Sequence, residues 1–358
     1  MDFEFNGDQE QLRDSVRRYL SDRAPIAYVR AQYEATTDAA VDDVWRGLAE
    51  LGLTAMLVPE AHGGAASGLV DLALPLGEMG RSLYPGPFAA SAVAATSLLA
   101  DLAHHDLAAE WLPRLATGDA VATLAFTDAR AAPVRRGEFG EIHGTKVHVP
   151  DAVAADLILV IADSGTTCTA VVPADTGVAI TPLATVDGSR RFATVTLDGV
   201  HGTPLTGDVA GAVSAANDRL GVAWVLDGIG AAEVALELTL EYAKQREQFG
   251  KPIGAFQAVQ HLCADMLRAI ELGRAVGYYA AWACDAADAT ERHRAATMAR
   301  AFAANDFYRV AANAIQVFGG IGFTWEHDIH LYYKRLLTLQ LAGGTASDYL
   351  EELAAIVL

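Results

Sequence analysis

Apolar residues recur at helical spacing through the first 120 residues of the chain. In DQEQLRDSVRRYLSDR, Leu12, Val16 and Leu20 follow one another at intervals of four, with acids and bases between them. This spacing places the three side chains on one face of a helix. VWRGLAELGLTAMLVPEAHGG reads as a helix that stops at a glycine and enters a loop, and VDLALPLGEMGRSL resumes the helical pattern despite Pro75. Residues 1–120 are therefore predicted to form a helical domain.

The hydrophobic period changes between about residues 121 and 205. Short β-type runs follow one another there, separated by Gly, Asp and Pro turns: VATLAFTD, EIHGTKVHV, LILVIAD, CTAVVPA, VAITPL and FATVTLDGV. Six such runs in this length predict a small antiparallel barrel or sandwich.

Helical periodicity returns from about residue 206 to residue 358. Two apolar stripes mark long helices that should bundle with one another. The first stripe is Val222, Val225, Leu226 and Ile229, and the second is Val259, Leu262, Cys263, Met266 and Ile270. The predicted order is therefore helices, a β domain and helices again.

The excess of acidic over basic residues argues against some classes of binding partner. The 358-residue chain has 26 basic and 45 acidic residues, a formal net charge of −19. Nucleic-acid binding needs clustered cations that release counterions from phosphates, so a nucleic-acid partner is not expected. A small anionic ligand remains open, because a few local arginines and glycine-rich amides can hold it against the overall field.

The lack of a recognisable targeting signal and the spacing of the cysteines predict a cytoplasmic protein. The N-terminal stretch MDFEFNGDQEQLRDSVRRYL carries acids from its second residue and has no apolar core of signal-peptide length. No run of eighteen apolar residues occurs, so no membrane span is predicted. Cys168, Cys263 and Cys284 lack metal-ligand spacing, which predicts reduced thiols and no metal site.

The stretch YAKQREQFGKPIGAFQAVQH, residues 242–261, lies between two helical patterns and is broken at residues 249–254. Arg246 precedes the break, and on a solvated helix face it could simply pair with Glu241 or Glu247. A later stretch, QVFGGIGFTWEHDIHLYYKR, contains a GGIG that by itself is typical of a helix C-cap and turn. Each signal alone is weak.

Together these two stretches resemble the acyl-CoA dehydrogenase family of flavoproteins. The resemblance covers nearly the whole chain, with LAELGLTAMLVPEAHGG and LGEMGRSL in the first region and GEIHGTKVHVPDAVAADLILV in the second. It implies an α+β, mostly α fold: an N-terminal helical domain (1–120), a middle antiparallel β domain (121–205) and a C-terminal four-helix bundle (206–358). It also implies α,β-dehydrogenation of an acyl-CoA thioester with FAD, and an electron-acceptor flavoprotein as a possible partner.

The resemblance implies that residues 242–261, the joint between the two helical patterns, bind FAD across a subunit boundary. Arg246, Phe249 and Gln257 would face the adenosine diphosphate half of a FAD held mainly by a neighbouring subunit. This chemistry is sensible, because a guanidinium matches phosphate geometry and glycines let backbone approach a pyrophosphate. The same part of the cofactor would be approached by Gln316, Val317, Phe318, Gly319 and Gly320.

The family's catalytic base is missing from both of its usual positions. Most members place a glutamate in an EGT motif before the final helix, and Gly343 stands there in LQLAGGTASDYLEEL, although Thr345 keeps its motif position and is expected near the cofactor. Other members carry the glutamate on the first bundle helix, where this chain has Leu220. Gly221 replaces a usual arginine, and Asp218 falls where an acid often contacts the CoA arm of the substrate.

The flavin and substrate positions of the β domain also depart from the family pattern. The loop that usually reads like TEPGAGSD is FTDARAAP, in which Thr127 keeps a flavin-contacting hydroxyl and Pro133 replaces a substrate-contacting serine. His148 and Pro150 stand where a tryptophan and a hydroxyl residue commonly border the isoalloxazine ring. A histidine there can serve as a chemical group, but a surface or core histidine is the simpler interpretation of His148.

Three hypotheses follow from the intact joint and the missing base. The first is the base-lacking subunit of a heterotetrameric acyl-CoA dehydrogenase, as in the actinobacterial α2β2 enzymes that act on steroid side-chain CoA thioesters. The second is a self-sufficient dehydrogenase with a relocated base, at Asp218 or Asp348. The third is a non-redox binding or scaffold member of the fold. Helix caps or solvated helix residues are the simpler interpretation of Asp218, Asp348 and Glu351.

Overall fold

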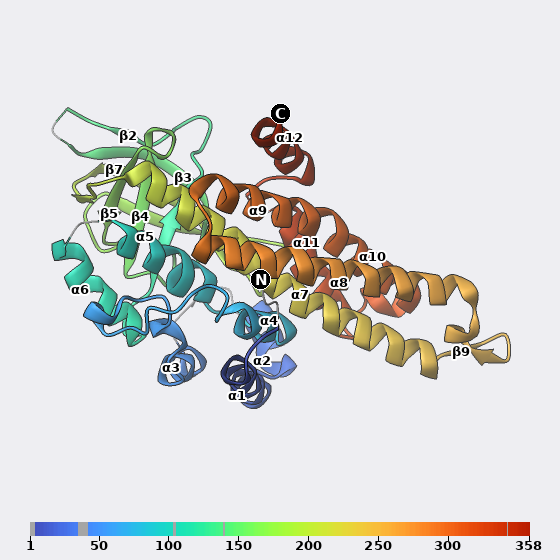
Figure 1. Cartoon of the computed structure of the whole chain (residues 1–358). Coiled ribbons are helices and arrows are strands. Elements are labelled where there is room, and N and C mark those ends of the chain that lie inside the picture. The colour runs from blue at the N-terminus through green and yellow to red at the C-terminus, as the bar shows by residue number, and fades with distance from the viewer. Residues whose placement is uncertain (1–3, 35–41, 103–104, 139, 342) are drawn as a thin grey trace. The chain divides into compact units, whose positions relative to one another are not determined.

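The computed structural model describes residues 4–34, 42–102, 105–138, 140–341 and 343–358 (Figure 1). The chain forms two compact units, each built from separated segments. The first comprises residues 1–30, 73–84 and 221–358, and the second comprises residues 31–72 and 85–220. These units are not the three predicted segments, whose boundaries at about 120 and 205 stay a prediction.

The described helices follow the predicted order of helices, strands and helices, and are rendered as coiled ribbons in Figure 1. Helix α2 and helix α7 run through the boundaries between the units. The α-helices are α1 (Gly7–Arg23), α2 (Ile26–Glu34), α3 (Asp43–Glu50), α4 (Ala73–Arg81), α5 (Thr96–Asp101), α6 (His105–Ala116), α7 (Val209–Gln245), α8 (Gln257–Ala286), α9 (Ala289–Phe302), α10 (Tyr308–Phe318), α11 (Ile329–Leu341) and α12 (Ala346–Val357).

Helix α1 begins at a capping box and packs on α4 in the first unit. The Asn6 side chain accepts from the backbone N–H of Gln9, and the Gln9 side chain accepts from the N–H of Asn6. These reciprocal bonds satisfy two N–H groups that a helix start leaves unpaired. Val16 and Leu20 of the predicted apolar face are buried, and Leu12 is half-buried.

The helical bundle of the first unit contains α8, α9, α10, α11 and the part of α7 from residue 221 (Figure 1). A π-helical turn at Ala303–Phe307 continues α9 into α10. All four residues of the first predicted stripe are buried, as are Cys263, Met266 and Ile270 of the second. The predicted core face is therefore confirmed for the first stripe and for three residues of the second, whereas Val259 and Leu262 are half-buried.

Small residues let the bundle helices approach closely. A Cβ on Gly277 of α8 would lie 3.0 Å from Ile229 Cδ1 of α7. A Cβ on Gly80 of α4 would lie 1.8 Å from the Asp227 carbonyl oxygen, a distance that no side chain tolerates. Glycine at position 80 is thus what permits the α4–α7 contact, whereas a side chain at position 277 would meet only the tip of the Ile229 side chain.

A buried ion pair connects α7 to α11 within the bundle. The Arg335 guanidinium donates to both carboxylate oxygens of Asp227, at 3.0 and 2.8 Å, and to the Tyr84 carbonyl at 2.9 Å. The side chains of Arg335 and Asp227 are 3% and 8% exposed. Such a pair is sensitive to the loss of one partner, because the remaining charge stays buried.

The second unit contains two four-stranded sheets that pack as a sandwich. Their orders are β1-β4-β5-β8 and β2-β3-β7-β6, and the buried core between them includes Val149, Ile158, Val195 and Leu197. The strands are β1 (Ala122–Ala125), β2 (Arg135–Arg136), β3 (Ile142–Pro150), β4 (Leu157–Ala162), β5 (Thr167–Val171), β6 (Val178–Leu183), β7 (Phe192–Val200) and β8 (Thr203–Pro204).

The predicted antiparallel pairing holds for these sheets except between β1 and β4. Those two strands pair in parallel, with Ala122 opposite Leu157. The chain leaves the first sheet after β1, forms β2 and β3 in the other sheet, and returns as β4. This long crossover allows a parallel pair, whereas a hairpin would have imposed an antiparallel one.

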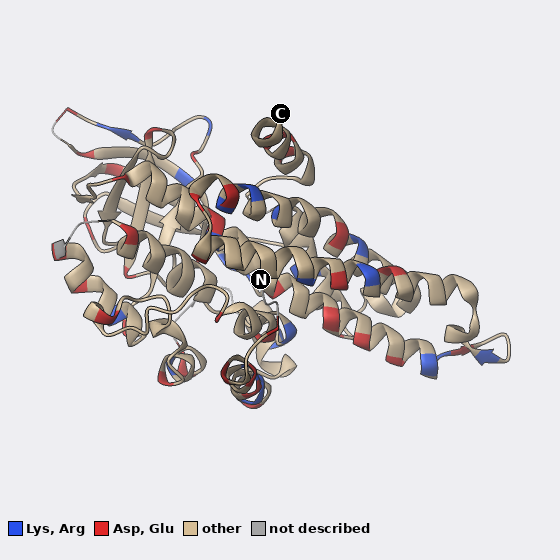
Figure 2. Ribbon diagram, viewed as in Figure 1, with Lys and Arg blue, Asp and Glu red and all other residues tan. Residues whose placement is uncertain are grey.

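Acidic and basic residues are interspersed along the helices (Figure 2). None of the helices among the described residues is long and apolar enough to cross a membrane. The three cysteines are buried and form no disulfide among the described residues, and burial raises the pKa of the Cys168 thiol to about 12.

Candidate functional site

The joint between α7 and α8 is a short β-hairpin. Strands β9 (Glu247–Gln248) and β10 (Lys251–Pro252) pair antiparallel, and Phe249 and Gly250 form the two-residue turn between them. Both turn residues have positive φ, 54° and 78°, as a tight primed turn requires. Glycine adopts this conformation freely, whereas a phenylalanine in it is strained. The Phe249 side chain is 92% exposed and meets the Phe256 ring edge-on at 6.1 Å.

Arg246 lies at the base of this hairpin with its guanidinium in solvent. Its backbone N–H donates to the Tyr242 carbonyl, and its own carbonyl accepts from the Ile253 N–H at 2.8 Å. Within the described chain the Arg246 side chain makes no hydrogen bond or ion pair, and Glu241 instead accepts from the Gln245 amide at 3.0 Å. The pairing of Arg246 with Glu241 or Glu247 is therefore not formed, and the guanidinium is available to a ligand.

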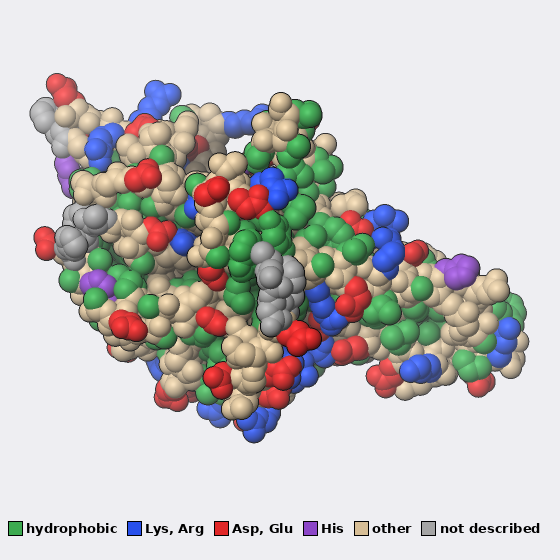
Figure 3. Space-filling model, viewed as in Figure 1, with side chains coloured by type: hydrophobic (Ala, Val, Ile, Leu, Met, Phe, Trp, Pro, Cys, Tyr) green, Lys and Arg blue, Asp and Glu red, His purple; other side chains and the backbone are tan. Residues whose placement is uncertain are grey.

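The start of α8 adds backbone donors beside this arginine. Gln257 is the first residue of the helix and is exposed, and the N-cap residue Phe256 provides no side-chain cap. A helix start of this kind leaves N–H groups that favour an anion, and the helix dipole adds to the effect. Figure 3 shows hydrophobic and basic side chains side by side at this end of the bundle.

The QVFGG segment lies at the C-terminal end of α10. The Phe318 ring stacks on Tyr242 of α7 at 4.4 Å, which brings this segment to the same end of the bundle as the joint. The side chains of Val317 and Phe318 are buried, whereas Gln316, Gly319 and Gly320 are exposed. Val317 and Phe318 can therefore contact a cofactor only through their backbone atoms.

The glycines of this segment leave open space at the surface. Gly319 has φ 65° and ψ −144°, a combination that is essentially restricted to glycine. No atom lies within 4 Å of the position of a Cβ on Gly319 or Gly320. A pocket of about 240 Å³ adjoins them, lined by Ala312, Ile315, Gln316, Gly319, Phe323 and Tyr333.

These donors fit the phosphates of a dinucleotide cofactor. A free guanidinium can bind phosphate in bidentate fashion, uncapped N–H groups suit an anion, and unobstructed glycines permit close approach. The exposed Phe249 ring offers a flat apolar surface beside them. The residues predicted to hold the adenosine diphosphate half of FAD are thus compatible with that role, which stays a prediction.

The two positions where the family carries its base have no carboxylate, and a cation lies beside one of them. Leu220 is 3% exposed on α7, in the second unit. In the first unit, Nη2 of Arg300 lies 3.7 Å from the position of a Cβ on Gly343. A Cβ on Gly221 would lie 2.0 Å from Nε of Arg300, so the glycine at 221 is what admits this arginine.

Tyr349 completes the surroundings of Gly343. Its hydroxyl lies 3.1 Å from the position of a Cβ on Gly343, and its ring faces the Arg300 guanidinium at 5.3 Å. Arg300 is 8% exposed and Tyr349 is 4% exposed. Neither residue was identified from the sequence, since no local motif marks them. The two glycines at 221 and 343 were the available signal, because each leaves room for another side chain.

The nearby carboxylates have structural surroundings. Asp348 accepts from the backbone N–H and the hydroxyl of Thr345, at 2.7 and 2.8 Å, in the capping box of α12. These bonds lower the pKa of Asp348. The Thr345 hydroxyl is thus engaged in capping, and its cofactor role stays a prediction. Asp218 is fully buried within α7, and Glu351 is exposed on α12.

The FTDARAAP loop follows β1 in the second unit and is held by Asp128. Its carboxylate accepts from the Val134 N–H at 2.9 Å and pairs with the buried Lys146 ammonium at 2.6 Å. Burial lowers the pKa of Lys146, and Asp128 opposes that effect. Thr127 is exposed, and its carbonyl accepts from the Val147 N–H at 2.9 Å.

His148 occupies an irregular part of β3. It is exposed, has φ 54°, and falls where the pairing of β3 with β7 shifts register. A β-bulge with a strained residue often re-aims a side chain. Pro133 is half-buried, and its carbonyl would lie 2.7 Å from a Cβ on Gly144. The roles predicted for Thr127, Pro133 and His148 stay predictions.

The fold and the sequence motifs together define a family. Residues 6–119 match the acyl-CoA dehydrogenase N-terminal domain, and residues 213–357 match the acyl-CoA dehydrogenase C-terminal domain. The chain belongs to the acyl-CoA dehydrogenase family. This confirms the resemblance and the fold class predicted from the sequence.

Individual relatives span nearly the whole chain. The chain is 36% identical over 330 residues to the acyl-CoA dehydrogenase IpdE2 of Mycobacterium tuberculosis, covering 92% of this chain and 90% of that protein. It resembles the ChsE4-ChsE5 complex from Mycobacterium tuberculosis, with a TM-score of 0.89, 27% identity and coverage of 100% and 99%. It also resembles the Tcur3481-Tcur3483 steroid ACAD G363A variant, with a TM-score of 0.88, 28% identity and coverage of 98% and 97%.

Proposed function

We propose that this chain is the base-lacking subunit of a heteromeric acyl-CoA dehydrogenase and completes the FAD site of a homologous partner. The observation that carries the proposal is a contrast. Arg246 is unpaired and exposed among the described residues. By contrast, the base position at Gly343 lies beside a buried cation, Arg300. A site built to donate a cofactor contact is intact, while the chain's own base site is lost.

The relatives support a heteromeric assembly and a steroid-derived substrate. ChsE4-ChsE5 is named as a complex, and Tcur3481-Tcur3483 pairs two proteins and is named a steroid ACAD. By analogy we infer a tetramer of two kinds of subunit in the cytoplasm, acting on a CoA thioester with a steroid-derived acyl group. An electron-acceptor flavoprotein would reoxidise the complex.

Each residue of the joint then has a defined task. The Arg246 guanidinium would bind a phosphate of the partner's cofactor, and Gln257 with the first turn of α8 would donate further hydrogen bonds. Gln316 and the open backbone at Gly319 would orient the adenosine end. FAD supplies the hydride acceptor of the reaction when it is bound. The proton of the substrate would be taken by a carboxylate of the partner.

The alternative of a relocated base is disfavoured by the surroundings of the two candidate carboxylates. Asp348 is held by Thr345, and these hydrogen bonds lower its pKa, which makes it a weaker base. Asp218 is fully buried and has interaction partners of its own.

Purification of the chain alone and together with a homologous dehydrogenase subunit tests the proposed function. We expect the complex to be yellow and to reduce an artificial dye with an acyl-CoA substrate. The lone chain should be at least about 10²–10⁴-fold less active, the usual contribution of a general base. A yellow, active lone chain would establish a relocated base. A colourless protein in every combination would favour a non-redox scaffold.

Restoring the missing carboxylate should not restore activity. In the Gly343→Glu variant the new carboxylate would lie near Arg300, and a cation that close lowers a carboxylate pKa by about 1–3 units. The position also has φ 81°, which strains any side chain. We expect dye reduction by this lone chain to stay at least about 10²-fold below that of the complex. Gly343→Ala is the matched control, because it adds the strain without the carboxylate. Turnover by the Glu variant that the Ala variant lacks would contradict the expectation.

A further inference from the structure

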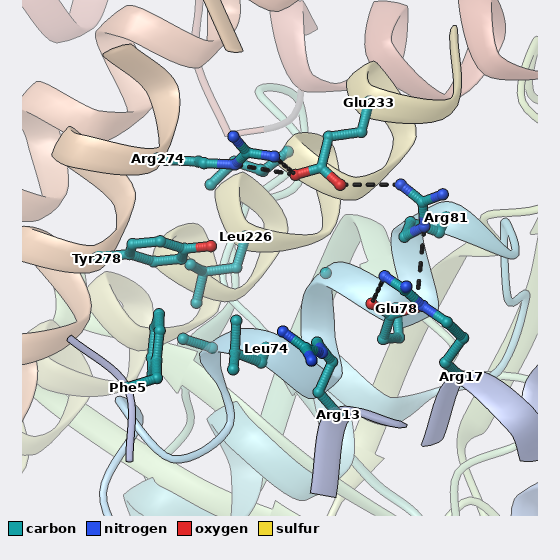
Figure 4. A pocket seen from close by; sticks show the side chains of 13 residues that line it. Phe5, Arg13, Arg17, Leu74, Glu78, Arg81, Leu226, Glu233, Arg274 and Tyr278 are labelled. Atoms are coloured by element: carbon teal, nitrogen blue, oxygen red, sulfur yellow. Dashed lines mark hydrogen bonds and ion pairs between the residues drawn. The ribbon is translucent and has the colours of Figure 1, made fainter. Parts of the chain in front are cut away.

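A second pocket lies in the first unit, away from the residues assigned to FAD (Figure 4). It has a volume of about 270 Å³ and is formed by the segment before α1 together with α1, α4, α7 and α8. Four arginines and two glutamates line it. Two of these arginines also pair with acids that are not among the lining residues, Arg81 with Glu237 at 2.8 Å and Arg274 with Glu271. Binding of an anion therefore depends on an arginine that still has an N–H group without a partner.

Three of these arginines are committed to the two glutamates. Arg17 donates twice to Glu78, at 2.8 and 2.7 Å. Glu233 accepts from Arg81 at 2.9 Å and from Arg274 at 2.7 and 3.1 Å. Both carboxylates are therefore compensated, so they repel an incoming anion little.

Arg13 is the lining arginine that these glutamates do not engage. Its Nε donates to Asp14 at 2.9 Å, and its Nη1 lies 3.9 Å from Glu10 on the same helix. Its Nη2 has no partner within the described part of the chain. In Figure 4 the Arg13 side chain reaches from α1 toward Leu74, another lining residue of the pocket.

Tyr278 contributes a hydroxyl with no hydrogen bond to any described residue. Figure 4 shows this hydroxyl directed toward Leu226. Burial raises the pKa of Tyr278, and the charge of Glu233 raises it further. The hydroxyl is therefore protonated at neutral pH and can donate to a ligand oxygen.

The rest of the pocket is apolar. Leu74, Leu226 and Ile229 line it, and the Phe5 ring meets the Tyr278 ring edge-on at 4.9 Å. A few placed polar groups within an apolar lining are the usual composition of a small-molecule site. The volume lies just below the range of about 300–1,000 Å³ typical for drug-sized ligands, so the ligand is small.

We propose that this pocket binds a small amphipathic monocarboxylate, with the carboxylate on Arg13 and the Tyr278 hydroxyl and the apolar body on Leu74, Leu226 and Ile229. The size fits a short-chain fatty acid or an aromatic acid such as benzoate. The inference goes beyond the proposed function, because none of these residues belongs to the joint or to the base positions.

Calorimetric titration of the full-length protein with benzoate and hexanoate tests the proposal. We expect both acids to bind, and inorganic phosphate and benzyl alcohol to bind at least about tenfold more weakly, since each lacks one half of the recognised group. Arg13→Gln should weaken benzoate binding about ten- to hundredfold, as expected for a charge-assisted bond. Tyr278→Phe should weaken it about two- to tenfold.

Arg18→Gln is the matched control, because Arg18 is exposed on the same helix and donates to the Asp14 carbonyl at 3.3 Å. It should bind benzoate like the wild type, and all variants should melt within a few degrees of it. Absence of benzoate and hexanoate binding to the wild type would overturn the proposal without requiring any variant to fold. Equal binding of phosphate and benzoate, or undiminished binding by Arg13→Gln, would overturn it as well.

Discussion

Asp227→Ala is expected to lower the free energy of unfolding by about 3–5 kcal/mol, because it leaves the Arg335 guanidinium buried without its counter-charge. The Arg335 side chain is 3% exposed, and two of its hydrogen bonds go to Asp227. The Tyr84 carbonyl, at 2.9 Å, would remain as an acceptor but carries no full charge. Chemical denaturation of the wild type and the variant measures the difference.

Asp43→Ala is the matched control for this prediction. Asp43 also pairs with an arginine, Arg46 at 2.9 Å, but its side chain is 82% exposed. A pair in solvent contributes about 0–1 kcal/mol, so this variant should be nearly as stable as the wild type. Similar losses for both variants would show that burial does not determine the contribution of Asp227.

Hydrophobic periodicity was sufficient to predict the long helices. The buried stripe from Val222 to Ile229 follows from spacing alone, because a helix that packs in a bundle must repeat its apolar residues every three or four positions. Strand pairing was harder, since alternation fixes which face of a strand is buried but not which strand lies beside it. The parallel β1–β4 pair and the two-residue strands β2 and β8 therefore could not be predicted.

Some features of the candidate site could likewise be predicted from the sequence, whereas others could not. The joint could be located from the sequence because its motif is continuous, and the structure adds that Arg246 is unpaired among the described residues. Arg300 could not be found, because its place beside Gly221 and Gly343 depends on three segments far apart in the chain. Sequence indicates that the base is missing, but only the packing identifies the cation beside that position.

If Arg246 serves a partner's FAD, Arg246→Ala should reduce FAD affinity of the heteromeric complex about ten- to more than hundredfold. A charge-assisted contact to phosphate contributes about 1.5–3 kcal/mol, and each 1.4 kcal/mol corresponds to about tenfold in affinity. The chain itself should fold and assemble normally, because the exposed guanidinium has no hydrogen bond or ion pair to the described residues. FAD content per complex and melting temperature should be measured together.

Arg268→Ala separates this effect from a general loss of surface charge. Arg268 is an exposed arginine of α8 that lies 3.8 Å from Asp265, and it is not part of the joint. Its variant should retain FAD like the wild type, whereas Arg246→Ala should lose FAD that is bound to the partner. If FAD occupancy stays unchanged in Arg246→Ala, the arginine has no cofactor role. If the complex instead unfolds while each folded complex keeps its FAD, the role of Arg246 is structural, and the donated half-site loses its main support.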